Sequence, residues 1–276
     1  MNKITFLGAG SSVFAKNVLG DCLQTDCLRE YEYALFDIDP KRLEESYMML
    51  SNINRNSNAG RAKIVKYDNR KEALRGAKYV VNAIQVGGYE PCTVTDFEIP
   101  KKYGLRQTIG DTNGIGGIFR ALRTIPVMLD FAKDMEEVCP DALFINYTNP
   151  MSMLTLAINR ATKVKTIGLC QSHQERIPTL FRTLDLPQDG LNYKIAGINH
   201  MAWLLEVSRN GENLYPEIPR RAVEGPVKDP YPPGLREKYP QIPSIAGEYS
   251  VTNHDDMVRF ELMKQFGYYV TESSEH

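Results

Sequence analysis

The sequence of 276 residues lacks several features that mark large classes of proteins. It has no excess of charge of either sign, because 33 Lys and Arg residues nearly balance 34 Asp and Glu residues, for a formal net charge of −1. This balance gives no support for binding to nucleic acid or to an anionic membrane. No apolar run approaches the roughly 20 residues needed to cross a bilayer. There is also no internal repeat and no low-complexity tract.

Cysteines are few, odd in number and widely spaced, at positions 22, 27, 92, 139 and 170. The N-terminus does not have the pattern of a signal peptide, because Lys3 is followed by a short strand-like run and then by glycines. An odd cysteine count in such a chain argues against a disulfide framework. We therefore expect a cytoplasmic protein with mostly buried thiols, so a role for Cys170 needs its own argument.

Strand-like and helix-like runs alternate through the first two thirds of the chain. Strands are predicted at 4–7, 33–36, 62–65, 79–84, 142–145 and 165–169, and helices at 13–24, 41–53, 118–138, 151–161 and 174–184. Pro40 is expected in the first turn of its helix, and Pro126 is expected to bend the long one. The alternation predicts an α/β fold with a doubly wound, parallel, Rossmann-like sheet.

The pattern changes near residue 190, where strands are no longer separated by helices. Two strands, a hairpin turn and a last helix are predicted at 193–198, 202–207, 209–212 and 255–266. Residues 216–243 hold 8 of the 16 prolines, a density that predicts a long loop or lid without a regular helix. The expected domains are a dinucleotide-binding domain over 1–190 and a partial α+β substrate domain over 191–276.

A glycine turn between the first strand and the first helix has the pattern of a dinucleotide site. Gly8 allows the tight turn, and Gly10 lets a pyrophosphate approach the backbone at the helix N-terminus. Ser11 and Ser12 can cap the helix and bond phosphate. The third glycine of the usual fingerprint is missing, since Val13 occupies its place. A glycine turn of an unrelated α/β protein is the alternative.

An acid and a second turn complete the pattern. Asp37 ends the second strand, where a carboxylate binds ribose hydroxyls and repels the extra phosphate of NADP, so NAD is favoured. Val86 and Gly87 follow the fourth strand, where a dinucleotide crosses the carboxyl edge of the sheet. The order of strand, turn, helix, strand and acid therefore favours an NAD site.

Two further segments carry candidate ligand-binding amides. Gly110 to Gly117 is a glycine-rich run that contains Asn113 and opens a helix, so it is either a ligand loop or a plain loop with a helix cap. Asn149 lies in the run Asn146 to Pro150 after the fifth strand. It either bonds a substrate or the nicotinamide amide, or caps the next helix.

Cys170 and His200 each end a strand-like run, and both are expected at the functional edge of the sheet. Thiolate and imidazole together can form half of a metal site that a sugar or a water completes. From spacing alone this signal is weak, because a lone cysteine is usually a core residue. His173 and His254 are rival ligands.

Together these motifs resemble the NAD-dependent glycosidases of glycoside hydrolase family 4, and specifically the α-galactosidase (melibiase) branch. The matching segments follow the family order: Gly8–Ser11, Asp37–Asp39, Gly110–Gly117, Asn146–Pro150, Gly168–Cys170 and Gly197–His200. The resemblance implies NAD as cofactor, a small-molecule α-galactoside as substrate, and a divalent metal, usually manganese, on Cys170 and His200. It also implies a homo-oligomer, either a dimer or a tetramer.

The implied reaction differs from that of the two-carboxylate glycosidases. Oxidation at C3 of the sugar is followed by deprotonation at C2, elimination of the aglycone, addition of water and re-reduction, so no net redox change occurs. The resemblance places the base on a tyrosine after the histidine, and Tyr268 is our first choice, ahead of Tyr269. Asn113 and Asn149 would bind the sugar. Asp256, or its neighbour Asp255, would donate a proton or support the metal, with helix N-terminal charge as the alternative.

The sequence departs from the family pattern at two places. Gln171 follows the metal cysteine where some phosphosugar-specific members have an aspartate as proposed general acid, so that role is unassigned here. Family members continue well beyond position 276, so we expect a C-terminal truncation. Two alternatives stay open: a lactate/malate-type NAD dehydrogenase, which shares the fold, and an inactive truncated remnant that binds NAD.

Overall fold

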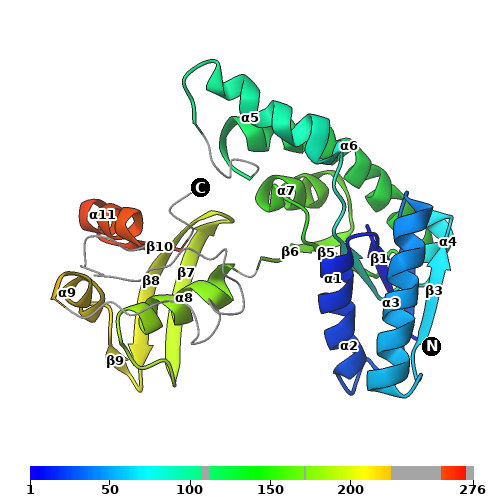
Figure 1. The fold of residues 1–276 in the computed structure, drawn as a ribbon, viewed down its shortest axis with the longest axis horizontal. Helices are drawn as coiled ribbons and strands as arrows, with labels where there is room; N and C mark the ends of the chain where they lie inside the picture. The colour runs from blue at the N-terminus through cyan, green and yellow to red at the C-terminus, as the bar shows by residue number, and fades with distance from the viewer. Residues whose placement is uncertain (107–111, 171, 225–255, 272–276) are drawn as a thin grey trace. The chain divides into compact units, whose positions relative to one another are not determined.

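The computed structural model describes residues 1–106, 112–170, 172–224 and 256–271. The chain forms two compact units, Met1–Leu169 and Cys170–His276 (Figure 1). Gln171, His254, Asp255 and most of the proline-rich stretch 216–243 lie outside the described residues. In the described part, no helix is both long and apolar enough to span a bilayer.

The first unit contains a six-stranded parallel sheet with the strand order β3-β2-β1-β4-β5-β6. Its strands are β1 (Lys3–Leu7), β2 (Glu32–Phe36), β3 (Lys63–Tyr67), β4 (Tyr79–Asn82), β5 (Leu143–Asn146) and β6 (Lys165–Gly168). The strand order reverses between β1 and β4, which is the arrangement that places ligands beyond the carboxyl ends of these strands. The predicted doubly wound parallel sheet is therefore confirmed.

The helices that connect these strands follow the predicted positions with some additions. They are α1 (Ser12–Phe14), a π-helical turn (Ala15–Leu19), α2 (Gly20–Gln24), α3 (Pro40–Asn58), α4 (Arg70–Leu74), a second π-helical turn (Gly88–Thr93), α5 (Val94–Lys101), α6 (Gly114–Val138) and α7 (Met151–Ala161). Pro40 opens α3 as predicted, and the Asp39 carboxylate accepts hydrogen bonds from the backbone N–H groups of Lys41 and Arg42, at 2.9 and 3.1 Å. The long helix α6 continues through Pro126.

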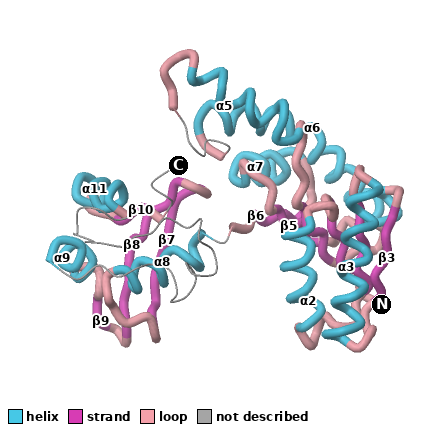
Figure 2. The backbone as a smooth tube through the Cα atoms, in the orientation of Figure 1, coloured by secondary structure: helices cyan, strands magenta, loops and turns pink. Residues whose placement is uncertain are grey.

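Helices cover both faces of the sheet (Figure 2), and a hydrophobic core lies between the sheet and each layer of helices. Successive side chains of a strand point to opposite faces, so Phe6 packs under α2 and α3 while its neighbour Leu7 packs under α4, α6 and α7. Tyr33 and Leu50 belong to the first core, and Phe144 belongs to the second. Because both faces are apolar, polar groups that bind ligands are left to the loops at the sheet edge.

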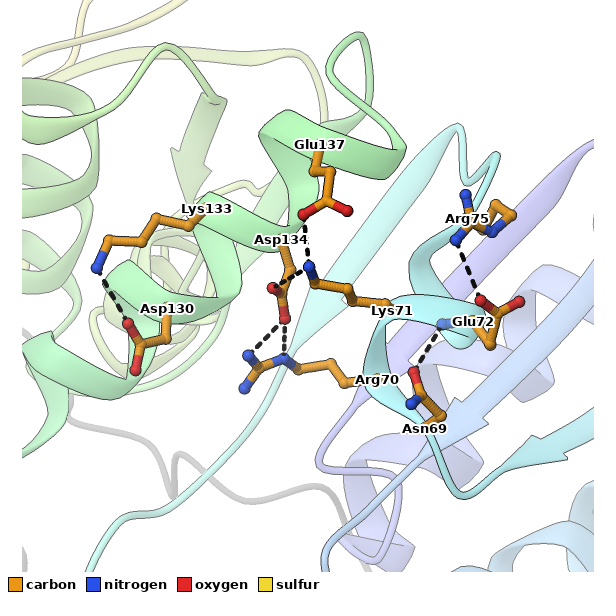
Figure 3. Close-up of polar contacts among 9 residues, drawn as sticks. All are labelled: Asn69, Arg70, Lys71, Glu72, Arg75, Asp130, Lys133, Asp134 and Glu137. Carbon is orange, nitrogen blue, oxygen red and sulfur yellow. Dashed lines mark hydrogen bonds and ion pairs between the residues drawn. The ribbon is translucent and has the colours of Figure 1, made fainter.

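Ion pairs fasten α4 to α6 on the second face (Figure 3). The Nε atom of Arg70 donates to Asp134 Oδ2 at 2.6 Å, and the Asp134 side chain is only 13% exposed. The guanidinium of Arg70 also lies 4.5 Å from the centre of the Phe131 ring. Lys71 pairs with Glu137 at the exposed margin of the same contact. These contacts hold α6, which forms one wall of the cleft described below.

The second unit is built around a small antiparallel sheet. Its described elements are α8 (Ser172–Thr183), β7 (Leu191–Ile198), β8 (Met201–Arg209), β9 (Glu212–Asn213), α9 (Glu217–Glu224), α11 (Met257–Phe266) and β10 (Tyr269–Val270). The predicted hairpin turn joins β8 to β9, with positive φ at both Asn210 and Gly211 as a type I′ turn requires. Leu180 and Phe181 of α8 pack on Leu204 and Val207 of β8.

Helix α9 contradicts the expectation that residues 216–243 hold no regular helix. Pro219 is the third residue of α9, within the first turn, where backbone N–H groups have no helical partner. A proline there removes no helical hydrogen bond, so the helix forms despite it. Ile218 and Ala222 then anchor α9 in the core of the second unit.

Candidate dinucleotide cleft and metal ligands

A cleft of about 450 Å³ lies over the carboxyl ends of β1, β2 and β4. This is the point where the strand order reverses, and in doubly wound sheets it is the place where dinucleotides bind. Five of the predicted cofactor residues line this cleft: Gly8, Ser11, Asp37, Val86 and Gly87. The structure therefore brings together residues that are up to 79 positions apart in the sequence, from Gly8 to Gly87.

The two glycines of the turn are both required by the geometry. Gly8 has a φ of +83°, and a Cβ atom there would lie 2.8 Å from the carbonyl oxygen of Ala83. A Cβ atom on Gly10 would lie 2.8 Å from Asp37 Oδ2 and 2.9 Å from the Cβ of Arg42. Any larger residue at either position would push the turn away from its neighbours, so the predicted glycine roles fit the structure.

Asp37 is tied to the backbone on both sides of its carboxylate. Its Oδ2 atom accepts a hydrogen bond from the N–H of Gly10 at 2.7 Å, and its Oδ1 atom accepts one from the N–H of Asp39 at 2.9 Å. The side chain is half-buried and borders the cleft. Each carboxylate oxygen has a second acceptor site, so Asp37 can still bind ribose hydroxyls.

The expected capping by serine side chains is wrong. Ser11 occupies the N-cap position of α1, but its side chain makes no capping hydrogen bond. Its ψ of 83° departs from the extended conformation of capping residues, and Ser12 is already inside the helix. A helix N-terminus that follows a glycine turn is an arrangement that favours bound phosphate.

A buried amide network joins the carboxyl ends of β4 and β5. The Nδ2 atom of Asn82 donates to Asn146 Oδ1 at 2.9 Å and to Thr148 Oγ1 at 3.0 Å. Thr148 Oγ1 in turn donates to the carbonyl of Ile84 at 3.0 Å. This network fixes the segment that carries Asn149, which is half-buried. Sequence reasoning missed Asn82, although a polar residue ending an apolar strand was a usable signal.

Asn113 occupies the N-cap position of α6 without a side-chain capping hydrogen bond. Asn113 thus holds the N-cap position that the plain-loop alternative names, with an extended backbone, but its side chain does not cap the helix. Residues 107–111, which include the first two residues of the glycine-rich run, lie outside the described residues. A sugar-binding role for Asn113 stays a prediction.

Cys170 and His200 do not lie at the edge of one sheet, which corrects the expectation from sequence. Cys170 follows β6 of the parallel sheet by two residues, whereas His200 lies in the turn between β7 and β8 of the antiparallel sheet. The physical reason is the length of the connection: two residues can join only antiparallel strands, since parallel strands need a long crossover. His200 has a φ of +62°, in the left-handed region.

The donor chemistry of Cys170 and His200 fits a metal whose shell is completed by other ligands. Thiolate and imidazole suit divalent transition metals, and two donors leave positions for water or substrate oxygen atoms. Both residues are partly exposed. Among the described residues, no group of three or more His, Cys, Asp or Glu side chains gathers as a closed metal site. The rival His254 lies outside the described residues, as does the side chain of His173.

The two candidate tyrosines have opposite surroundings. Tyr269 is fully buried, and burial and the neighbouring Asp256 carboxylate raise its pKa well above the ordinary value, so it keeps its proton. Tyr268 is 46% exposed and stands edge-on to the Tyr215 ring at 6.1 Å. Exposure therefore ranks Tyr268 above Tyr269 as a group that could exchange a proton.

The register of the small sheet separates Tyr268 from His200. Tyr269 pairs with Leu204, which is four residues along β8 from His200. At about 3.4 Å per residue this is roughly 14 Å, and Tyr268 lies further in the same direction. There it borders a cavity of about 1110 Å³ that the described residues of β8, α9 and α11 enclose. The structure thus does not bring these two predicted site residues together.

Asp256 forms a buried ion pair with Arg259. It occupies the N-cap position of α11, and the side chains of Asp256 and Arg259 are only 6% and 2% exposed. Removing either partner would leave the buried charge of the other without this ion pair. The alternative of a structural charge at a helix N-terminus therefore accounts for the position of Asp256 without a catalytic role.

The cleft, its two obligatory glycines and the Asp37 carboxylate define a dinucleotide-binding α/β protein. Comparison with known proteins then narrows the class. The chain belongs to family 4 of the glycosyl hydrolases: the family model described as Family 4 glycosyl hydrolase matches residues 3–186, and the model of the Family 4 glycosyl hydrolase C-terminal domain matches residues 195–276. The predicted family resemblance is confirmed.

Relatives and solved structures support this assignment. An α-galactosidase of Bacillus subtilis (strain 168) is 61% identical over 276 residues, which is 100% of this chain and 58% of the relative. The chain thus spans little more than half the length of that relative. A crystal structure of lplD from Bacillus subtilis matches with a TM-score of 0.79 and 25% identity, over 100% of this chain and 62% of that chain.

Two further structures illustrate the fold. The 6-phospho-beta glucosidase from Thermotoga maritima, solved with manganese, NAD+ and glucose-6-phosphate, matches with a TM-score of 0.71 and 25% identity, over 81% of this chain and 53% of that chain. A lactate dehydrogenase from Eimeria maxima matches with a TM-score of 0.56 over 79% of this chain and 60% of that chain. Its identity is 16%, so this likeness shows the dehydrogenase-like fold alone.

Proposed function

We propose that this chain belongs to an NAD- and divalent-metal-dependent glycosidase that hydrolyses α-galactosides of the melibiose type, and that it carries the residues that bind NAD, the metal and the sugar. The observation that supports this most is the 61% identity, along the whole chain, with an α-galactosidase. The dehydrogenase alternative has only the fold in its favour, because its structural neighbour is 16% identical.

The residues of the cleft fit NAD. Gly8 and Gly10 would let the pyrophosphate approach the backbone at the start of α1, with Ser11 and Ser12 beside it. Asp37 would bind the ribose hydroxyls and disfavour the extra phosphate of NADP. Val86 and Gly87 would contact the nicotinamide half, beyond the end of β4. These roles are supported by the cleft that Gly8, Asp37 and Gly87 line together.

Cys170 and His200 are the proposed ligands of the metal, with Mn²⁺ as the first candidate because a family member was solved with manganese. When bound, NAD supplies a hydride acceptor at C3 of the sugar and the metal supplies a Lewis acid. Asn149 and Asn113 would hold the sugar hydroxyls. The buried amides of Asn82 and Asn146 support this role by fixing the loop of Asn149.

Two neighbouring tyrosines, Tyr268 and Tyr269, are the candidates for proton transfer at C2. Tyr268 is proposed as the base at C2, and its exposure favours it over Tyr269. Tyr268 lies beyond Leu204 from His200. For Tyr268 to reach a sugar bound at the His200 metal site, β10 would have to approach the β7–β8 turn. Loss of a deuterium label from C2 to solvent measures deprotonation at that carbon. If the label is still lost in the Tyr268→Phe variant, Tyr268 is not the base. Asp256 would act as proton donor only after release from Arg259.

The decisive experiment is hydrolysis of p-nitrophenyl α-galactoside with NAD and Mn²⁺, with and without EDTA. We expect turnover that needs both cofactors and no net accumulation of NADH, because the proposed reaction is redox-neutral. Full activity without NAD would overturn the proposal, and steady accumulation of NADH would indicate a dehydrogenase. NAD binding without turnover would indicate a chain that binds the cofactor only.

We also propose a domain division, an oligomeric state and a location for the chain. The division into a dinucleotide-binding domain at 1–190 and a substrate domain at 191–276 is supported by the break between the two family models, which falls between residues 186 and 195. A homo-oligomer follows from the family resemblance alone. The cytoplasm is the proposed location because the reaction would draw on the cellular supply of NAD.

A further inference from the structure

The loop that follows β4 is held by a side chain that neither the motifs nor the proposed chemistry account for. Arg123 of α6 makes a bidentate pair with Asp96 of α5, with Nη1 to Oδ1 at 3.1 Å and Nη2 to Oδ2 at 2.6 Å. Its Nε atom donates to the carbonyl of Val86 at 3.4 Å. The Asp96 side chain is 8% exposed and that of Arg123 is 25% exposed. One guanidinium thus joins α6, α5 and the cofactor loop.

The turn at Gly87 packs directly against this pair. Gly87 has a φ of +90°, and a Cβ atom there would lie 2.5 Å from the sulfur of Cys92 and 3.0 Å from Nε of Arg123. Thr93 adds a hydrogen bond of 3.3 Å from its hydroxyl to the carbonyl of Gly88. The loop Val86–Gly88 therefore has no room to shift toward α6. The position of Arg123 fixes where this loop lies relative to the carboxyl end of β4.

Helix α6 also supplies a wall of the cleft. Val127 and Phe131 line the cleft, and they lie one and two turns after Arg123 on the same face of the helix. The pair of Arg123 and Asp96 therefore sets the distance between two parts of the cleft wall, the loop at Val86 and the helix at Val127. A lysine could keep the positive charge of Arg123 but not the planar fork that holds a carboxylate and a carbonyl together.

We propose that Arg123 is a positioning residue that fixes the loop Val86–Gly88 for the nicotinamide half of the dinucleotide. The inference rests on the proposed function, since it takes NAD as the ligand. In a doubly wound sheet the dinucleotide crosses the switch point with its adenosine ribose at the acid that ends β2, here Asp37. The proposal places the nicotinamide half beyond β4. Arg123 thus acts on one half of the ligand, while the glycine turn and Asp37 bind the other half.

Two ligands of different length test this division. Calorimetric titration of the full chain with NAD and with AMP compares the whole site with its adenosine end alone. We expect Arg123→Lys to weaken NAD binding by about tenfold, the loss expected for a charged hydrogen bond, while AMP binding stays within about twofold of wild type. Asp96→Asn should give the same pattern, and the double variant should be no weaker than either single one.

Arg209→Lys is the matched control. Arg209 also holds one carboxylate and one carbonyl, both of Asp189, at 2.7 and 3.1 Å, but it lies in the second unit. We expect its NAD affinity to equal that of wild type. Thermal unfolding of each variant without ligand shows whether the chain is still folded at the titration temperature.

The outcomes are distinct. An Arg123→Lys variant that is folded and binds NAD as tightly as wild type overturns the inference and leaves the proposed function intact. Equal loss of NAD and AMP affinity also overturns it, because a general loosening of the first unit would weaken both. A wild-type chain that binds AMP but not NAD, or neither, overturns the proposed function and this inference with it.

Discussion

The carboxylate of Asp37 accepts a hydrogen bond of 2.7 Å from the backbone N–H of Gly10. This contact ties the end of β2 to the turn after β1. A turn and an acid that the chain itself holds together need less ordering when a dinucleotide binds, which lowers the cost of binding. The closeness of the two groups also makes Gly10 a sensitive position of the site.

Substitution of Gly10 by alanine should weaken NAD binding by at least about tenfold. The added Cβ would lie 2.8 Å from Asp37 Oδ2, so the turn and the acid must separate. Calorimetric titration with NAD measures the effect. Gly20→Ala is the control, because Gly20 lies inside α2 and the methyl group of an alanine there would have no neighbouring atom within 4 Å. Its NAD affinity should be unchanged, and its stability equal or higher.

Substitution of the two proposed metal ligands should abolish Mn²⁺ binding and leave NAD binding within about twofold of wild type. Cys170→Ser removes the thiolate. His200→Asn removes the imidazole and keeps a residue that tolerates the positive φ of 62° at this turn, which alanine would not. Electron paramagnetic resonance of Mn²⁺ and titration with NAD provide the two readouts. Retention of Mn²⁺ affinity in Cys170→Ser would show that the thiolate is not a ligand.

The contact between α4 and α6 should contribute measurably to stability. Asp134→Asn leaves Arg70 without its charged partner in a place where Asp134 is 13% exposed, so we expect a loss of about 2 kcal/mol. Asp130→Asn on the same helix is the control, since its pair with Lys133 is 60% and 71% exposed and should be worth less than about 0.5 kcal/mol (Figure 3). Urea unfolding measures both, and equal losses would contradict the prediction.

Stability in acid should depend on Glu32. Burial raises the pKa of this carboxyl, but hydrogen bonds from Lys63 and Tyr67 and the charge of Lys3 together lower it below its ordinary value of 4.5. Because the pKa of Glu32 is lower in the folded state than in the unfolded state, its carboxylate contributes fully to stability at a pH above the unfolded-state pKa. This contribution is lost as the pH falls through the folded-state pKa. Glu32→Gln should therefore be less stable than wild type at neutral pH.

The same reasoning predicts that the difference in free energy of unfolding between wild type and Glu32→Gln becomes smaller as the pH falls below about 4.5. Urea unfolding at a series of pH values measures it. The exposed Glu30→Gln is the control and should follow wild type at every pH. If this difference in free energy of unfolding does not change with pH, Glu32 stabilises the fold through packing rather than through its charge.

The positions that sequence predicted well are those set by local rules. Met151–Ala161 was predicted to the residue as a helix, and Pro40 was placed correctly at a helix start, because periodicity and proline geometry act within one element. The short helix α4 and the two-residue strand β10 were missed. Each is too short to show a period, and β10 exists only because β8 offers it a partner.

The residues of the candidate site also fall into two groups, those that local motifs predicted and those that only the tertiary structure shows. Gly8, Gly10 and Asp37 were found from sequence because a glycine turn between a strand and a helix has one main use. Arg123 was not found, since nothing near it in the chain signals a partner 37 residues away. Asn82 had a usable signal as a polar residue at the end of an apolar strand, but nothing near it identifies its partner Asn146, 64 residues away. The exposed Tyr268 and the buried Tyr269 were indistinguishable as neighbours in sequence, yet they differ entirely in their surroundings.

The sequence by itself determined the parallel sheet, the glycine turn with its acid, and the family. These follow from hydrophobic periodicity and from motifs whose chemistry needs particular residues at particular spacings. The short link between β7 and β8 already requires the antiparallel hairpin that holds His200, but the tertiary structure alone decided that Tyr268 lies beyond Leu204 from it. It also decided that Asp256 is held by Arg259 in the interior. Strand pairing and burial are properties of contacts between distant segments, and no local pattern encodes them.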